Sequence, residues 1–153
     1  MSIYREMGFT DVDEHPQGEI LYALARTFTL LQKRFAPCYA RHQLDAVKVN
    51  ALMIIKHIGR THGIPQREIA DRLILSASNV SHLIDGLERQ GFITRHAAKD
   101  RRVKLLKITP KGSKLLDALW PHHRRLAEQV VTLSAAERKT LLQLLTKLRA
   151  AAT

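Results

Sequence analysis

Residues 65–112 constrain the fold of this chain more than any other stretch. Two segments with apolar residues at helical spacing follow each other closely there. A first helix is predicted to begin with Pro65 at its first position, where the missing N–H costs nothing. After a three-residue turn, Ser76 supplies the N-cap of a second helix, which Gly91 stops. The inner faces comprise Ile69, Ala70 and Leu73 in the first helix and Val80, Leu83, Ile84 and Leu87 in the second. This layout predicts a helix-turn-helix.

A basic ribbon follows directly. Residues 92–95 and 103–108 are rich in strand-forming side chains. The loop between them, residues 96–102, is basic. Two strands and a basic loop placed directly after the second helix predict a wing.

The N-terminal side is predicted to supply two further helices. Residues 1–17 show no sustained period and are interpreted as a mobile or loosely docked arm. Residues 19–35 carry an amphipathic stripe, and Pro37 is expected to end that helix or to mark a break close by. Residues 45–59, with Asp45 as N-cap, should form a core helix.

The C-terminal side is also helical in this prediction. Thr109 should cap a helix that extends to about residue 131 and is kinked at Pro121. A capping box of Ser134 and Glu137 should start a last amphipathic helix. A helix-turn-helix core cannot cover all these apolar stripes, and exposed stripes mark association. We therefore expect a homodimer built from residues 19–35 and 110–150.

The predicted fold class is mainly α with a small β wing (α+β), a winged helix-turn-helix with flanking dimerisation helices. The predicted boundaries are 1–17 for the arm, 18–44 for a dimerisation helix and linker, 45–109 for the winged helix-turn-helix, and 110–153 for the C-terminal dimerisation helices.

Charge and composition narrow the class of partner. The formal net charge is +11, which favours a polyanionic partner, nucleic acid before membrane, although many basic proteins bind neither. The single cysteine, Cys38, excludes an internal disulfide and fits a reducing cytosol. We found no signal segment and no apolar run long enough to cross a bilayer, so we expect a cytoplasmic protein with no membrane partner.

The sequence resembles the MarR family of multiple-antibiotic-resistance-type regulators over roughly residues 19–150. The motifs that carry the resemblance are Ile69-Ala70 with Leu73, Ser76-x-Ser78-x-Val80, Leu83-Ile84-Asp85-x-Leu87-Glu88, Gly91-Phe92-Ile93-x-Arg95, Asp100-Arg101-Arg102 and Ile108-Thr109-x-Lys111-Gly112. The resemblance implies homodimers that repress or, less often, activate transcription, and that release double-stranded DNA on binding a small-molecule effector or on oxidation. It also implies that Arg102 enters the minor groove and that Asp100 orients the wing arginines.

Three positions depart from the family pattern. Pro65 stands where a capping threonine is common, so the cap hydrogen bond is lost. Gly86 stands where a basic residue is common, which costs about 1 kcal/mol of helix propensity relative to alanine. Cys38 lies beyond the first predicted helix, whereas the reactive cysteine of the peroxide sensors lies early in it, so the oxidation mechanism does not transfer.

Candidate DNA-binding residues lie on the second helix and on the wing. Asn can bond adenine in a bidentate manner, and Ser or protonated His can contact bases or phosphates. The recognition-helix candidates are Ser76, Ser78, Asn79, Ser81 and His82. The wing candidates are Lys99, Asp100, Arg101, Arg102 and Lys104, and Gln66 and Arg67 are expected to support the helix-turn-helix. The alternative is a solvated polar helix face and a solubilising hairpin.

Other functions were weighed. Cys38, His42, His122 and His123 are a conceivable zinc set, against the simpler alternative of a buried thiol and solvent-facing histidines; no cofactor is expected. A winged-helix module that binds protein would need an apolar or acidic recognition face. An enzyme is not expected, because no glycine-rich phosphate loop, paired carboxylates or Ser-His-Asp set stands out.

Overall fold

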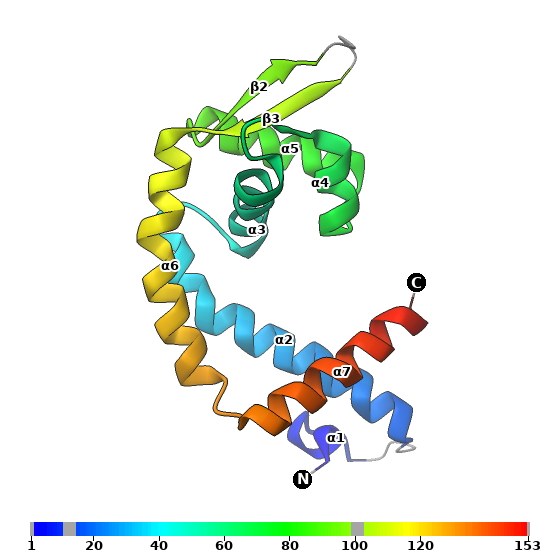
Figure 1. Cartoon of the computed structure of the whole chain (residues 1–153). Helices are drawn as coiled ribbons and strands as arrows, with labels where there is room; N and C mark the ends of the chain where they lie inside the picture. The colour runs from blue at the N-terminus through cyan, green and yellow to red at the C-terminus, as the bar shows by residue number, and fades with distance from the viewer. Residues whose placement is uncertain (1, 11–14, 99–102, 153) are drawn as a thin grey trace.

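The computed structural model of this chain describes residues 2–10, 15–98 and 103–152. An upper lobe spans residues 46–108, and the long helices that precede and follow it extend below (Figure 1). The predicted class, mainly α with a small antiparallel β-sheet, is confirmed.

Helix α2 (Pro16–Ala40) is the first long helix, with His15 as its N-cap. Pro37 does not end this helix, which continues through the proline for another turn and ends close by, at Ala40. Cys38 and Tyr39 in that turn are both buried in the core. This packing outweighs the lost hydrogen bond and the steric cost of a proline inside a helix.

The N-terminal arm contains a short helix, α1 (Ile3–Glu6), which has no counterpart in the prediction. Tyr4 is 3% exposed. Its ring meets that of Tyr22 on α2 edge to face, with 5.5 Å between centroids. Glu6 Oε1 and Arg26 Nε are 2.6 Å apart. The described part of the arm is therefore docked on α2. The arm was predicted to end at residue 17, but α2 already begins at Pro16.

The predicted core helix is divided into α3 (Ala46–Ile54) and a π-helical turn, η1 (Ile55–Gly59). The N-cap is confirmed, because Asp45 Oδ1 accepts the backbone N–H of Lys48 at 2.8 Å. By α-helical spacing Ile58 falls on the same stripe as Ala51, Ile54 and Ile55, yet it is 45% exposed. A π turn holds more residues than an α turn, and so it rotates this side chain out of the stripe.

Helices α4 (Gln66–Leu73) and α5 (Ala77–Arg89) confirm the helix-turn-helix. Ser76 Oγ accepts the backbone N–H of Asn79 at 3.3 Å, and Gly91 follows α5 with φ +72°. The predicted position of Pro65 is shifted by one residue: it is the N-cap of α4 and makes no side-chain cap bond.

The sheet contains β1 (Ile64–Pro65), β2 (Ile93–Ala97) and β3 (Lys104–Ile108), all antiparallel in the order β1-β3-β2. The two predicted wing strands are present, and β1 is an addition. Ile64 lies opposite Leu106, and both are buried. The sheet therefore covers the hydrophobic core of the lobe at the base of the β2–β3 hairpin.

Helix α6 (Pro110–Val130) leaves the sheet and follows a curved path down the molecule (Figure 1). Thr109 Oγ accepts the Gly112 N–H at 3.1 Å, and α6 remains helical through Pro121. Helix α7 (Ala135–Ala151) begins with the predicted capping box: Ser134 N–H donates to Glu137 Oε2 at 2.8 Å.

The hydrophobic core lies in the lobe and at its junction with α2 and α6. Its largest fully buried side chains are Leu52, Ile55, Ile64, Ile69, Ile84, Leu87, Ile93, Leu106 and Val80. Helix α7 contributes no buried side chain. Within the described ranges, no helix is both long and apolar enough to cross a membrane.

Candidate nucleic-acid interface

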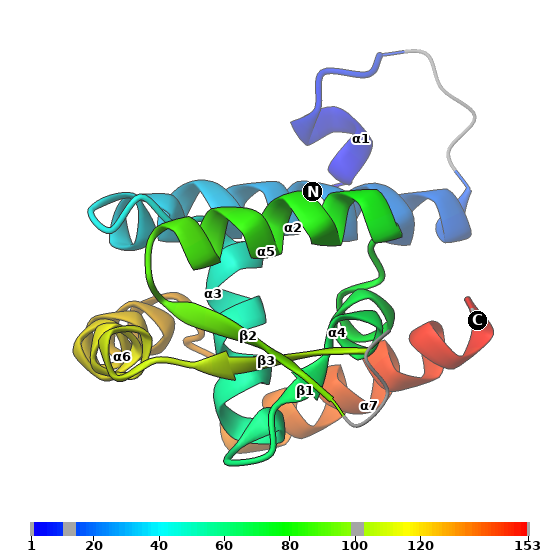
Figure 2. The same cartoon turned by 90° about the horizontal axis from the view of Figure 1, so that it is seen from above.

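The outward face of α5 presents polar side chains to solvent. Val80, Ile84 and Leu87 are buried on its inner face, so the positions between them point away from the core. Ser78, Asn79 and His82 are exposed, and their side chains have no hydrogen-bond partner within the described parts of the chain. Viewed from above, α5 lies along one side of the lobe, with the β2–β3 hairpin beside it (Figure 2).

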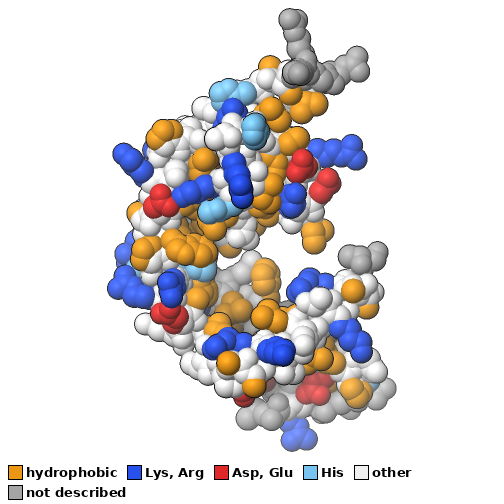
Figure 3. Space-filling view, in the orientation of Figure 1, with side chains coloured by type: hydrophobic (Ala, Val, Ile, Leu, Met, Phe, Trp, Pro, Cys, Tyr) orange, Lys and Arg blue, Asp and Glu red, His pale blue; other side chains and the backbone are white. Residues whose placement is uncertain are grey.

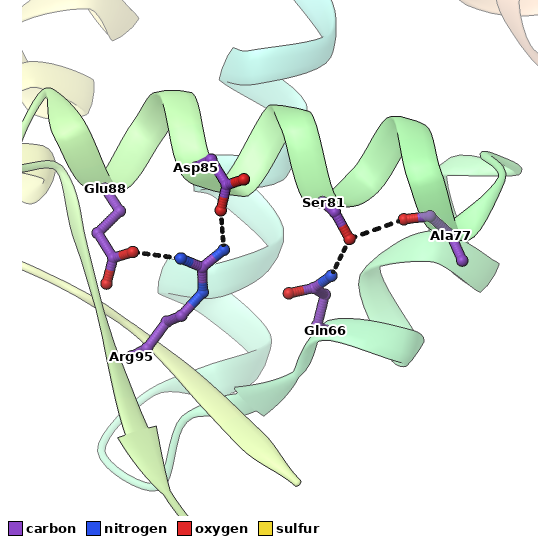
Figure 4. A network of polar contacts seen from close by, with 6 residues as sticks. All are labelled: Gln66, Ala77, Ser81, Asp85, Glu88 and Arg95. Carbon is purple, nitrogen blue, oxygen red and sulfur yellow. Dashed lines mark hydrogen bonds and ion pairs between the residues drawn. The ribbon is translucent and has the colours of Figure 1, made fainter. Parts of the chain in front are cut away.

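Two of the five recognition-helix candidates have internal bonds instead. Ser76 Oγ is occupied by the N-cap bond. Ser81 is half-buried, where its hydroxyl accepts from Gln66 Nε2 at 2.9 Å and donates to the Ala77 carbonyl at 3.0 Å (Figure 4). Gln66 thus ties α4 to α5, as expected for a supporting residue. Arg67 is exposed on α4.

Arg95 of β2 connects the wing to α5, a contact that was not predicted. Its guanidinium donates from Nη2 to Asp85 Oδ1 at 2.5 Å and from Nη1 to Glu88 Oε2 (Figure 4). Burial lowers the pKa of Arg95, but the hydrogen bonds and charges of the two carboxylates raise it more in total. One cation therefore pairs with both acidic side chains of α5 and offsets half of their charge.

The same face extends to Arg89. Asp85 and Arg89 follow Ser78 and His82 at helical spacing, and all four are exposed. Arg89 was not among the sequence candidates, although this spacing could have identified it.

The wing strands carry a concentration of basic residues. Lys104 is exposed and lies opposite Ala97 in the β ladder. Four wing candidates fall outside the described residues, namely Lys99, Asp100, Arg101 and Arg102. In the sequence they belong to the segment from Arg95 to Lys107. This segment contains six Lys and Arg residues and one acid, Asp100.

The proposed metal ligands are not brought together. Cys38 is buried near the end of α2, and burial raises the pKa of its thiol, partly offset by the charge of Arg41. His42 is exposed in the turn after α2, beyond the end of that helix at Ala40. Among the described residues, no three His, Cys, Asp or Glu side chains form a cluster that could hold a metal ion.

His123 packs in an aromatic cluster. Its ring is stacked on Trp120, with 5.1 Å between centroids, and lies 5.0 Å from Phe35. Burial lowers the pKa of this imidazole. His122, the fourth ligand candidate, is exposed beside Arg125.

Two pockets flank α6 at its junction with the lobe. One, of about 340 Å³, is lined by Met53, Lys56, His57, Leu116, Asp117, Trp120 and Pro121. In it, Lys56 Nζ and Asp117 Oδ1 are 2.6 Å apart. The other, of about 490 Å³, lies between the α2–α3 turn, the end of α5 and the start of α6.

The long helices expose much of their apolar surface. Phe28 on α2 is 60% exposed, and Leu144 on α7 is also 60% exposed. Hydrophobic side chains stand among Lys and Arg on the visible face of the lower helices (Figure 3). The stripes predicted for dimerisation are thus uncovered in the single chain.

Known proteins share this architecture. A model of the MarR family matches residues 46–103. Over 120 residues the chain is 25% identical to the HTH-type transcriptional regulator MhqR of Bacillus subtilis (strain 168), covering 78% of this chain and 81% of MhqR. Over 87 residues it is 40% identical to the HTH-type transcriptional regulator YkoM of the same organism, covering 54% and 56%. The crystal structure of the S. aureus MepR–DNA complex matches with a TM-score of 0.78 at 23% identity, over 85% of this chain and 96% of that one.

Proposed function

Because this chain belongs to the MarR family of DNA-binding transcriptional regulators, we propose that it is a homodimeric repressor that leaves a pseudo-palindromic operator when a small molecule binds. The observation that carries the proposal is the outward face of α5. There Ser78, Asn79 and His82 are exposed beside a hairpin whose sequence is strongly basic.

The chemistry of these side chains suits a major groove. The Asn79 amide can pair with adenine through one donor and one acceptor, and Ser78 and His82 can bond base edges or phosphates. Asp85 and Glu88 would repel phosphates, but Arg95 offsets half of their charge. We assign Arg102 to the adjacent minor groove, whose narrow stretches attract arginine, and Asp100 to orienting it. Lys99, Arg101 and Lys104 then face phosphates.

Dimerisation is supported by the helices outside the lobe. Helix α7 has no buried side chain, yet Leu141, Leu144, Leu145 and Leu148 lie on one of its faces. A partner that covers this face and the exposed side of α2 would remove the apolar patch from water. Two lobes related by a two-fold axis would then read two half-sites.

Effector release is supported by the two pockets beside α6. Both lie where a helix that leaves the lobe packs against elements that position α5. A ligand there can bias the arrangement of the two lobes, provided that it binds the DNA-bound and free forms with different affinity.

Operator titration tests the DNA-contact assignments. DNA recovered by the protein from a random-sequence pool is titrated by fluorescence anisotropy at several salt concentrations. Asn79→Ala should weaken binding by about tenfold or more, whereas Asn50→Ala, an exposed asparagine on α3, should not change it. Arg102→Ala should weaken binding and reduce the salt slope by about one. Unchanged affinity in both Asn79→Ala and Arg102→Ala would contradict the interface.

A further inference from the structure

We infer that the turn between η1 and β1 is a second contact with the DNA backbone, on phosphates outside the half-site that α5 reads. We call residues 57–63 the basic turn. The inference rests on the proposed function and extends it, because the basic turn belongs neither to α5 nor to the β2–β3 hairpin. It assigns sequence reading to one surface of the lobe and sequence-independent binding to another.

The backbone of the basic turn is strained at Arg60. This residue has φ +41° and ψ −126°, a combination that glycine adopts freely and that other residues avoid. The turn is closed by the Gly63 N–H, which donates to the Gly59 carbonyl at 2.7 Å. An arginine at a position where glycine would remove the strain indicates a role for its side chain.

The Arg60 side chain is exposed and has donors to spare. Its Nε donates to the His57 carbonyl at 3.3 Å. Within the described parts of the chain, Nη1 and Nη2 form no hydrogen bond and no ion pair. A guanidinium binds phosphate oxygens through two parallel N–H donors, so these two nitrogens suit a DNA phosphate.

The basic turn carries positive charge with no acid close to it in the sequence. His57, Arg60 and His62 are all exposed, and residues 55–66 contain no Asp or Glu. Lys56 is already paired, because its Nζ lies 2.6 Å from Asp117 Oδ1 of α6. Figure 3 shows His, Lys and Arg side chains together on the front of the lobe. A surface with one sign of charge attracts a polyanion such as DNA.

The basic turn is continuous with the outer face of the sheet. A Cβ built on Gly63 would lie 3.1 Å from Lys107 Cγ, so the Lys107 side chain lies against the turn. Lys107 pairs with Thr94 across the β ladder, and His96 follows two residues later on the same face. Leu106, on the opposite face, is buried, so Lys107 and His96 lie on the outer one.

The hairpin separates the basic turn from α5. Strands β1 and β2 form opposite edges of the sheet, and α5 lies on the β2 side (Figure 2). Under the proposed function, a duplex that receives α5 in its major groove passes the hairpin and continues beyond it. The phosphates that the basic turn meets therefore belong to DNA that flanks the half-site. Contacts of this kind position the protein but carry no sequence information.

An acidic segment of another protein would also be attracted to these cations. Ile58, which is 45% exposed, would then supply an apolar contact. The observations favour duplex DNA, because the cations continue onto the sheet of the wing, next to the proposed DNA-binding hairpin. One apolar side chain also falls short of the apolar core that protein–protein interfaces have.

Binding of two duplexes, measured by fluorescence anisotropy, tests the inference. Both contain the operator that the wild-type chain selects, and the long duplex adds about 10 base pairs, roughly one helical turn, of unrelated sequence at each end. Arg60→Gly should weaken binding of the long duplex about tenfold and of the short duplex by less than about twofold. The salt slope on the long duplex should fall by about one for each bound chain.

Two control variants isolate the charge. Arg60→Lys keeps the cation and should bind the long duplex within about threefold of the wild type. Arg124→Ala removes an equal charge from an exposed site on α6 and should change binding of neither duplex. A loss in Arg124→Ala as large as that in Arg60→Gly would reduce the effect to net charge and overturn the inference.

Thermal unfolding separates the contact from a folding defect. Because glycine relieves the strain at residue 60, the melting temperature of Arg60→Gly should rise by roughly 2 to 4 °C. The variant should therefore be more stable and yet bind the long duplex more weakly. A lower melting temperature, or an equal loss of affinity for both duplexes, would overturn the inference.

The remaining outcomes distinguish the ways in which the inference can fail. If Arg60→Gly lost affinity for a poly-glutamate peptide but bound both duplexes as the wild type does, the basic turn would belong to an acidic protein partner. If Arg60→Gly matched the wild type on both duplexes and on the peptide, only the flanking contact would fail. If the wild-type chain selected no DNA at all, the proposed function would fail together with the inference that rests on it.

Discussion

The lobe and the long helices differ in how far one chain completes them. In the lobe, Leu52, Ile84 and Leu106 have no exposed surface, and polar side chains such as Gln66 and Ser81 bond each other. On α7, by contrast, no side chain is buried, although the helix has good caps. Local sequence signals such as caps and apolar stripes specify the helices of both regions. Packing within one chain buries apolar side chains in the lobe but not on α7. Under the proposed function, a second copy of the chain would cover the exposed apolar faces of these helices.

The largest effect is expected from a charge placed on the apolar face of α7, because this tests whether a second copy covers that face. Leu144→Arg should leave the lobe folded, since Leu144 is 60% exposed, but should split the dimer. DNA affinity should fall at least a hundredfold, because two linked lobes gain from effective concentration. Sedimentation velocity and anisotropy measure the two effects. Gln143→Arg, with the same charge on the opposite face, is the control, and an equal loss there would contradict the assignment of the face.

Truncation of a core side chain tests the packing of the lobe. Ile84→Ala, at a fully buried position of α5, should lower the free energy of unfolding by about 2 to 5 kcal/mol. Urea unfolding followed by circular dichroism measures it. The corresponding change at an exposed site, Leu142→Ala, should cost far less. Similar losses at the two sites would mean that α7 is as well packed as the lobe.

Much of the lobe could be predicted because its signals are local. Caps at Asp45 and Ser76, the stripe of α5 and the stop at Gly91 each depend on neighbours a few residues away, and all are confirmed. Strand β1 could not be found this way. It is two residues long and forms only by pairing with β3, far along the chain.

The misses share one physical cause. Pro37 normally ends a helix, but burial of the turn that follows it outweighed that local preference. Ser81 is a recognition-helix candidate by its helical position, and its hydrogen bond from Gln66 of α4 was not foreseen. Arg95 was placed only in a predicted strand, whereas it pairs with two carboxylates of α5. Tertiary contacts decided each case, and spacing along the chain does not show them.

Breaking the Arg95 pairs tests whether the wing and α5 act as one unit. Arg95→Ala should lower DNA affinity about tenfold by leaving two carboxylates near the phosphates. Its effect on stability should stay below about 1 kcal/mol, because both carboxylate partners are partly exposed to solvent. Anisotropy and urea unfolding separate the two effects. Adding Asp85→Asn and Glu88→Gln to Arg95→Ala should restore part of the affinity, and no recovery would refute the electrostatic explanation.

A small gain is expected at Gly86. A Cβ built there would meet no atom within 4 Å, so Gly86→Ala has room on α5. Alanine should raise the free energy of unfolding by about 1 kcal/mol through helix propensity. Thermal unfolding checks this, and a lower melting temperature would show that the glycine has a role beyond its conformational freedom.

The smallest expected effect is a pH dependence at the junction between lobe and helices. Burial lowers the pKa of His123 below its ordinary value of 6.5 in the folded protein. On acidification the unfolded chain takes up the proton first, so this residue should reduce stability as pH falls below about 6.5. His123→Phe should abolish that component of the urea-unfolding profile between pH 7.5 and 5. Identical profiles would exclude His123 as its source.

Selection of DNA by the purified chain from a random-sequence pool tests the central claim most directly. If two lobes read DNA together, the recovered sequences should share an inverted repeat whose half-site centres lie about one helical turn, roughly 10 base pairs, apart. A single unrepeated motif, or no enriched sequence at all, would contradict a two-fold reader built from α5, the wing and the long helices.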